Sequence, residues 1–159
     1  MIRTRHGSAV IELVNELDVV ITREFEAPME LVFDVLTTPE HVRNWFFDRE
    51  VKECSIDLRV GGDYRFATVM KDGAAMAFYG TFLEIERPTR FVDTWRFDGW
   101  PEVEAVETVH LREADGVTTM TDTLTFSDRA GLERMVKSEF GGVQDAYDRV
   151  EDLLRTLVG

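Results

Sequence analysis

Strand-like segments follow one another through the middle of the chain, and one long helical segment comes after them. Residues 129–157 keep apolar side chains at the helical period of about 3.6 residues, and we expect this helix to bend or break at Gly141-Gly142. A series of strands followed by a long helix is typical of an α+β fold. The strand-like runs, rich in β-branched and aromatic residues, are 50–56, 64–70, 77–86, 91–97, 104–113 and 117–126.

The first part of the chain adds one strand and two short helices. Residues 19–25 form a β-rich run that stops at a proline, and Pro28 and Pro39 each suit the first turn of a helix. We interpret residues 1–16 as an N-terminal extension or an edge strand, and 17–159 as a single domain, because no linker or repeat interrupts them. The expected fold is a curved antiparallel sheet of about six or seven strands around the C-terminal helix.

The dipeptide Asp115-Gly116 is the strongest hairpin signal in the sequence, since it suits a two-residue type I′ turn. Such a turn fixes the register of the two flanking strands. It places Glu107 and Asp122 on the apolar face and His110 on the opposite, threonine-rich face. A buried carboxylate needs a partner, water or a raised pKa. The two carboxylates therefore either lie at a paired or hydrated rim, or line a ligand cavity.

Aromatic residues are more numerous in the middle of the chain than one helix-covered sheet needs for its core. Core packing accounts for many of them, and a cavity lined by the others is the economical alternative. Asp93 shares a strand face with three aromatic residues, so Glu107, Asp122 and Asp93 are the candidates for a catalytic role. The expected ligand-binding residues are Trp45, Phe46, Phe66, Phe78, Phe82, Trp95, Phe97, Met120, Phe140, Val143 and Tyr147.

The composition narrows the range of partners. With 31 acidic and 18 basic residues, the net charge of −13 repels phosphate backbones and anionic lipids, so we expect neither nucleic acid nor a membrane as a partner. The single cysteine, Cys54, excludes an intrachain disulfide and indicates the cytoplasm. The three histidines lack metal-site spacing and no cofactor fingerprint occurs, so we expect no metal and no cofactor. The sequence leaves monomer and homodimer open.

Several motifs of the chain resemble a known family. The chain from residue 17 onwards is similar to the family named after the activator of the heat-shock chaperone ATPase, within the START-like (SRPBCC) superfamily. The resemblance implies a helix-grip fold, with 17–159 forming one START-like ligand-binding domain whose cavity lies between sheet and helix. The motifs that carry it are residues 21–28, 30–33, 38–41, 57–62, 107–108, 115–118 and 147–149, with Trp45, Gly80 and Gly142.

The chain departs from this family at two places near the expected cavity mouth. The family's Trp-Trp-Gly-Pro appears here as Trp45-Phe46-Phe47-Asp48, and its Gly-Met in the last helix appears as Ser138-Glu139. The identity of a family ligand therefore does not carry over to this chain.

Three functions follow as hypotheses. We expect a protein that binds a small hydrophobic or aromatic molecule, polyketide-like or lipid-like, in the cavity. The first alternative is an enzyme of the polyketide cyclase/dehydratase type that uses the cavity carboxylates as acids and bases. The second is a chaperone-interacting module, although we do not expect chaperone activation, because the co-chaperone uses a separate N-terminal domain for which this chain has no room. The sequence does not decide between binding and catalysis.

Overall fold

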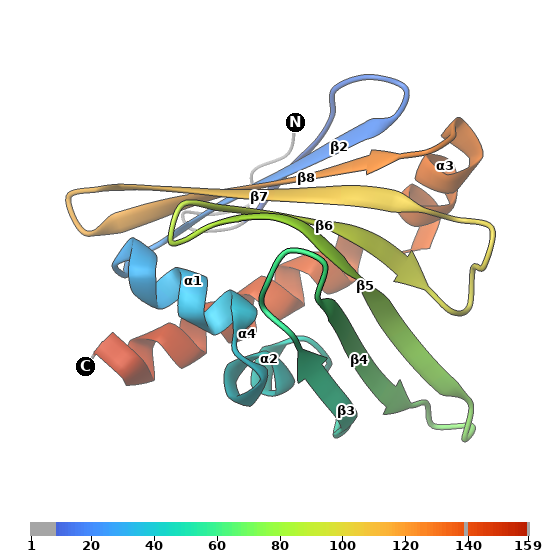
Figure 1. Ribbon diagram of the computed structural model, residues 1–159, viewed down its shortest axis with the longest axis horizontal. Coiled ribbons are helices and arrows are strands. Elements are labelled where there is room, and N and C mark those ends of the chain that lie inside the picture. The colour runs from blue at the N-terminus through green and yellow to red at the C-terminus, as the bar shows by residue number, and fades with distance from the viewer. Residues whose placement is uncertain (1–8, 139, 159) are drawn as a thin grey trace.

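The computed structural model describes residues 9–138 and 140–158 of the chain, without the side chains of 138 and 140–142. Two helices follow the second strand and two more follow the last strand, and the strands between them come one after another along the chain (Figure 1). The elements are β1 (Val10–Leu13), β2 (Asp18–Phe25), α1 (Met29–Thr37), α2 (Pro39–Trp45), β3 (Val51–Ile56), β4 (Asp63–Val69), β5 (Ala75–Glu86), β6 (Arg90–Phe97), β7 (Ala105–Ala114), β8 (Val117–Phe126), α3 (Arg129–Ser138) and α4 (Phe140–Val158).

The strands form one antiparallel sheet in the order β1-β2-β8-β7-β6-β5-β4-β3. The sheet curves, and α1, α2 and α4 lie on its concave side (Figure 1). This arrangement is the expected α+β fold, but the described residues hold eight strands rather than six or seven. The additional strand is β1, whose residues Val10–Leu13 pair with the outer side of β2. Its four residues are too few to give a clear alternating pattern in the sequence.

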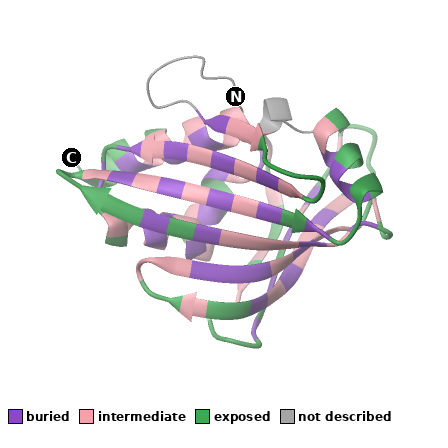
Figure 2. Ribbon diagram, turned by 90° about the horizontal axis from the view of Figure 1, so that it is seen from above, coloured by how far each residue is buried: buried purple, intermediate pink, exposed green. Residues whose placement is uncertain are grey.

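The hairpin of β7 and β8 has the predicted register. Ala114 lies opposite Val117 and Glu107 lies opposite Leu124. Asp115 and Gly116 both have positive φ angles, of 53° and 79°, as a type I′ turn requires. Burial alternates along β8, which Figure 2 shows as alternating bands. The apolar face of the hairpin therefore faces the concave side, and the threonine face lies outside.

The C-terminal helix predicted for 129–157 is described as α3 and α4, on either side of residue 139, which lies outside the described residues. Asp128 caps α3, because its Oδ1 accepts a hydrogen bond of 2.8 Å from the backbone N–H of Gly131. Gly141 and Gly142 lie within α4, directly after residue 139, so whether the helix bends or breaks near these glycines lies outside the described residues.

Gly80 of β5 lies where the backbone of β6 approaches most closely. A Cβ atom on Gly80 would lie 1.8 Å from the carbonyl oxygen of Thr94 and 2.9 Å from Cε1 of Tyr64. Glycine is therefore the residue that lets the Tyr64 ring lie flat against β5. This contact matters for the site, because it fixes the direction in which the Tyr64 hydroxyl points.

Replacing Gly80 by alanine should destabilise the fold by about 1–3 kcal/mol, because the added methyl group would clash with the Thr94 carbonyl and the Tyr64 ring. The change Thr81→Ala, at the next position of β5, removes a half-buried hydroxyl that donates to the exposed Asp63, and is a control expected to alter stability by less than about 1 kcal/mol. Urea unfolding of both variants measures the difference. Equal stability of the two variants would contradict the close approach at Gly80.

Candidate functional site

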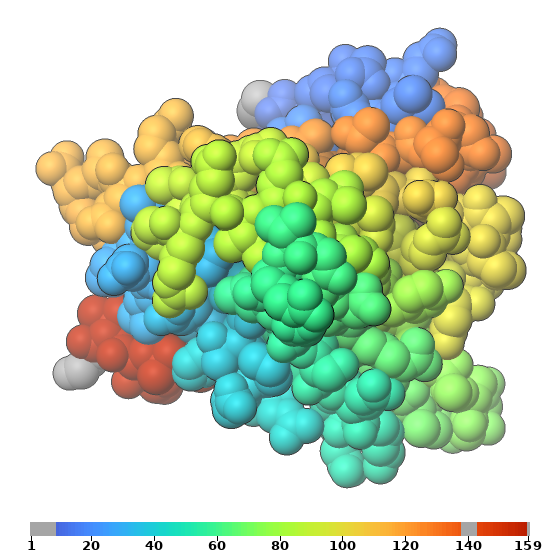
Figure 3. All heavy atoms as spheres, viewed as in Figure 1, coloured from blue at the N-terminus to red at the C-terminus, as the bar shows by residue number. Residues whose placement is uncertain are grey.

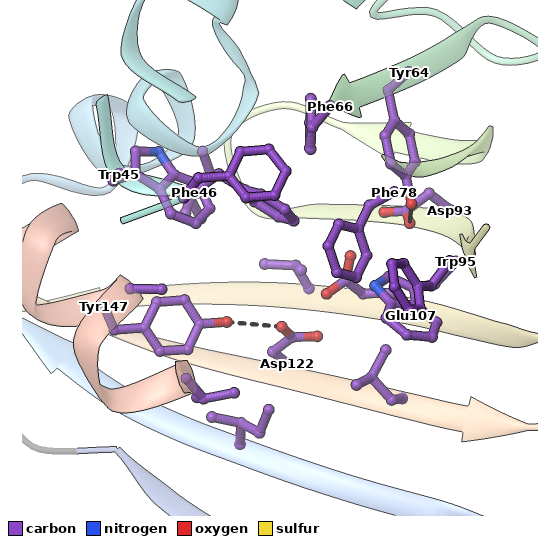
Figure 4. A pocket seen from close by; sticks show the side chains of 18 of the residues that line it. Trp45, Phe46, Tyr64, Phe66, Phe78, Asp93, Trp95, Glu107, Asp122 and Tyr147 are labelled. Atoms are coloured by element: carbon purple, nitrogen blue, oxygen red, sulfur yellow. Dashed lines mark hydrogen bonds between the residues drawn. The ribbon is translucent and has the colours of Figure 1, made fainter. Parts of the chain in front are cut away.

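A cavity of about 420 Å³ lies between the concave face of the sheet and the helices α2 and α4. The connection between β3 and β4 lies over the middle of the molecular face shown in Figure 3. The cavity volume falls in the range of about 300–1,000 Å³ that is usual for small-molecule sites. The wall is mainly aromatic and aliphatic, with a short series of acidic side chains (Figure 4).

The structure brings most of the predicted ligand-binding residues together around this cavity. They come from α2, α4 and the strands β4, β5, β6 and β8. The side chain of Phe140 lies outside the described part of the structure, so its position is not assigned. The predicted residues that line the cavity are Trp45, Phe46, Phe66, Phe78, Phe82, Trp95, Phe97, Met120, Val143 and Tyr147.

Many of these rings pack against one another and also line the cavity. The Phe46 ring centroid lies 4.8 Å from that of Phe66 and 5.3 Å from that of Phe78. Phe78 in turn stacks on Phe97 at 4.9 Å. The indole N–H of Trp45 donates to the backbone carbonyl of Val35 at 2.9 Å, which holds the indole in place. The rings therefore form a fixed aromatic wall, so core packing and cavity lining apply to the same side chains.

Three carboxyl groups lie side by side across the sheet within the cavity. Asp93 on β6 is directly opposite Glu107 on β7, and Asp122 on β8 is the diagonal neighbour of Glu107. All three line the cavity, and Glu107 is within hydrogen-bonding reach of both aspartates. Two carboxylates can share a hydrogen bond only if one of them holds a proton. These three groups, Asp93, Glu107 and Asp122, form a carboxyl row. The row therefore holds protons that neighbouring carboxyl groups share.

A tyrosine closes each end of this row, as Figure 4 shows. Tyr147 on α4 donates its hydroxyl proton to Oδ2 of Asp122 at 2.9 Å. The Tyr64 hydroxyl lies 2.7 Å from the carbonyl oxygen of Thr94 and 3.1 Å from Oδ1 of Asp93. The Tyr64 hydroxyl donates toward these two oxygens, and its hydrogen bond to Asp93 lowers the pKa of that carboxyl against the larger effect of burial.

Burial shifts the titration of the whole row in the same direction. Desolvation, and then the neighbouring acidic groups, raise the pKa of Asp93 and of Glu107 to about 8. The same two causes raise the pKa of Asp122 well above its ordinary value. They also raise the pKa values of Tyr64 and Tyr147. At neutral pH the deep cavity therefore holds neutral, hydrogen-bonding acids rather than a cluster of negative charges.

Charged side chains surround the opening of the cavity. Asp48 and Asp145 are exposed residues of its lining, and Arg49 pairs with Asp48 at 3.0 Å. That hydrogen bond to Arg49 lowers the pKa of the Asp48 carboxyl. Arg149 donates its Nε proton to the backbone carbonyl of Trp45 at 2.8 Å, which links α4 to the end of α2. The opening is thus polar while the interior is aromatic.

Sequence reasoning missed Tyr64 and the charged opening. Tyr64 lies two residues before Phe66 on β4, and the period of two along a strand could have placed it on the same inward face. Arg149 contacts Trp45, which lies far from it in the chain, and no local sequence pattern predicts this contact. Other lining residues outside the prediction include Ile21, Leu36, Phe47, Ile56 and Leu124.

Within 9–138 and 140–158, no group of three or more histidine, cysteine, aspartate or glutamate side chains is arranged to hold a metal ion. No helix in that part of the chain is long and apolar enough to cross a membrane.

Solved structures share this architecture. A crystal structure of a protein from Rhodobacter sphaeroides has a TM-score of 0.87 and 20% sequence identity, covering 94% of this chain and 99% of that one. A protein from Nitrosomonas europaea has a TM-score of 0.79 and 24% identity, covering 91% of this chain and 98% of that one. At this identity the likeness establishes the fold, including the curved sheet and the C-terminal helix, and no more.

Sequence comparisons add a relative and a family. An uncharacterized protein of Schizosaccharomyces pombe is 28% identical over 148 residues, which are 90% of this chain but only 38% of that protein. The chain thus spans less than two fifths of the length of this curated relative. Residues 26–155 match the family model described as "Activator of Hsp90 ATPase homolog 1-like protein". This match includes the α2 motif, the three cavity carboxyls and most of α4, and the chain therefore belongs to the Activator of Hsp90 ATPase homolog 1-like family.

Proposed function

We propose that this protein binds a small hydrophobic or aromatic molecule in the cavity between the sheet and α4. The observation that carries the proposal is the cavity itself, about 420 Å³ in volume, with an aromatic wall and one row of hydrogen-bonding acids. A ligand site of this kind combines a large apolar surface with a few polar groups that orient the ligand. The single Cys54 is a free thiol, which agrees with a reducing compartment such as the cytoplasm.

A variant that fills the cavity tests the proposal. Ala146 on α4 lines the cavity, and Ala146→Phe should occupy part of its volume. We expect the affinity for 2-(2-naphthyl)ethanol to fall about tenfold or more, because the ring of the probe and the new ring compete for the same space. The fluorescence of Trp45 and Trp95, which line the cavity, reports binding in a titration.

The matched control is Ala130→Phe, which places the same ring at an exposed position of α3. The control should bind the probe as the wild type does. If the wild type and Ala146→Phe bind the probe equally, the probe occupies another part of the molecule. The proposal of a cavity ligand would then be wrong for molecules of this kind.

The carboxyl row favours a second candidate function, an acid-catalysed cyclisation or dehydration. Glu107, held between Asp93 and Asp122, is a protonated acid within the cavity and could donate a proton to a bound substrate. In that case Glu107→Gln should leave substrate affinity nearly unchanged and lower turnover by about 10²–10⁴-fold. If the protein only binds, no turnover exists to be lost, and the variant changes affinity alone.

A further inference from the structure

The titratable groups deep in the cavity are all acids. Each of the strands β4, β6, β7 and β8, together with α4, contributes one of them: Tyr64, Asp93, Glu107, Asp122 and Tyr147. The two arginines that line the cavity, Arg49 and Arg149, have other partners near the opening: the Asp48 carboxylate and the backbone carbonyl of Trp45. The described interior therefore has many hydrogen-bond acceptors and no basic side chain among them.

One of these acceptors depends on a shared proton. Asp122 is only 4% exposed, and its buried Oδ1 atom receives no hydrogen bond from an N–H or hydroxyl group of the described residues, so only a proton shared with Glu107 can satisfy it. In Figure 4 the Asp122 carboxyl lies beside Glu107, inside the cavity. A buried oxygen without a donor costs free energy, and a donor supplied by a ligand would remove that cost.

Aromatic rings stand close to the same acids. Trp95 and Phe78 lie next to Glu107, and the ring of Tyr147 points at Asp122 (Figure 4). Aromatic rings attract cations through their faces, and Trp95 and Phe78 are the rings beside Glu107. An acceptor that only a shared proton satisfies, acids without a basic partner among them, and neighbouring aromatic rings are three separate features, and all three suit a positively charged group.

We propose that the ligand carries a cationic amine that binds among Asp93, Glu107 and Asp122, with its apolar part against the aromatic wall. This inference rests on the proposed function, since it specifies the chemical class of the cavity ligand. An amine supplies N–H donors to the carboxyl row, including Asp122 Oδ1, and its charge takes the place of a proton that the row holds. Binding of one ammonium ion should therefore release about one proton to the solvent.

This exchange makes the affinity depend on pH. The groups that face the row are Tyr64, Tyr147 and the three carboxyls themselves, and Arg23 on β2 acts on Tyr147 from the side of the sheet. Because the pKa values of Asp93 and Glu107 are about 8 without a ligand, the row holds its protons at pH values below this. The affinity for an amine should rise by up to about tenfold per pH unit until the row ionises.

A pair of probes of equal shape tests the inference. Isothermal titration calorimetry compares 2-(2-naphthyl)ethylamine with 2-(2-naphthyl)ethanol at a pH of about 7.5, in two buffers of different ionisation enthalpy. We expect the amine to bind about tenfold or more tightly than the alcohol, with release of about one proton. Glu107→Gln should weaken the amine by about tenfold and change the alcohol by less than about threefold, whereas the exposed control Glu26→Gln should change neither.

The outcomes separate this inference from the proposed function. Equal affinities for amine and alcohol, without proton release, would overturn the amine inference and leave the cavity as an apolar binding site. Binding of the amine that Glu107→Gln and Glu26→Gln weaken equally would also overturn it, since surface charge would then be the cause. Binding of neither probe to the wild type would overturn the proposed function together with the inference.

Discussion

The free energy of unfolding should fall as the pH rises from about 4 to about 8, because the folded carboxyl row retains protons that the unfolded chain has released. Asp93 and Glu107 have folded-state pKa values of about 8, against ordinary values of 3.8 and 4.5. Between those limits the folded protein binds more protons than the unfolded chain does. Stability is therefore greatest below the unfolded pKa values and is lost as the pH approaches the folded ones.

The variant Glu107→Gln isolates this effect from the other acidic residues. Its amide cannot ionise and can donate hydrogen bonds to both aspartates. We expect the variant to match the wild type at a pH of about 4 and to exceed its stability by about 1–3 kcal/mol at a pH of about 8. Urea unfolding across this pH range measures the difference, with Glu26→Gln as an exposed control.

A stability difference that does not change with pH would contradict the protonated row. So would a Glu107→Gln variant that loses stability at high pH, since this would mean that the ionised carboxylate has a favourable partner. The control should follow the wild type within about 0.5 kcal/mol at every pH, because its side chain is exposed.

Removing both acidic partners of Arg23 should cost about 3–5 kcal/mol at neutral pH, because a buried charge is then left without compensation. The Arg23 side chain is 1% exposed and lies between the sheet and α4. Its NH1 atom is 2.9 Å from Asp148 Oδ1 and its NH2 atom is 3.2 Å from Glu151 Oε1. This ion pair joins α4, and with it Tyr147, to β2.

The double variant Asp148→Asn/Glu151→Gln tests this prediction by urea unfolding. A matched control is Asp152→Asn on the same helix, where the carboxylate is 73% exposed and pairs with the exposed Arg155. The control should lose less than about 0.5 kcal/mol, as exposed ion pairs do. A double variant that loses no more than the control would show that α4 does not depend on the Arg23 ion pair.

Local pattern was enough to predict the β7–β8 hairpin and the inward direction of its carboxylates. The reason is that a two-residue turn fixes the register, and the period of two along a strand then assigns every side chain to a face. The position of Asp93 directly opposite Glu107 could not be predicted in this way. The loop between β6 and β7 is longer, so no turn rule sets the register of that pair.

Contacts between distant segments account for the other features of the structure that could not be predicted from the sequence. Arg23 interrupts the apolar face of β2, which signals a buried partner, but the partners lie 125 and 128 residues further on, at Asp148 and Glu151. Tyr64 reaches Thr94 because Gly80 leaves room between them.

The most direct test of the central claim is to locate a bound probe by nuclear magnetic resonance. Isotope-labelled protein saturated with 2-(2-naphthyl)ethanol should give intermolecular nuclear Overhauser effects from the naphthyl protons to Val143, Trp95 and Met120, all of which line the cavity. Ala146→Phe should abolish these effects. Effects confined to exposed apolar residues such as Leu83 and Val69 would contradict the account, since the probe would then lie on the outer surface rather than between the sheet and α4.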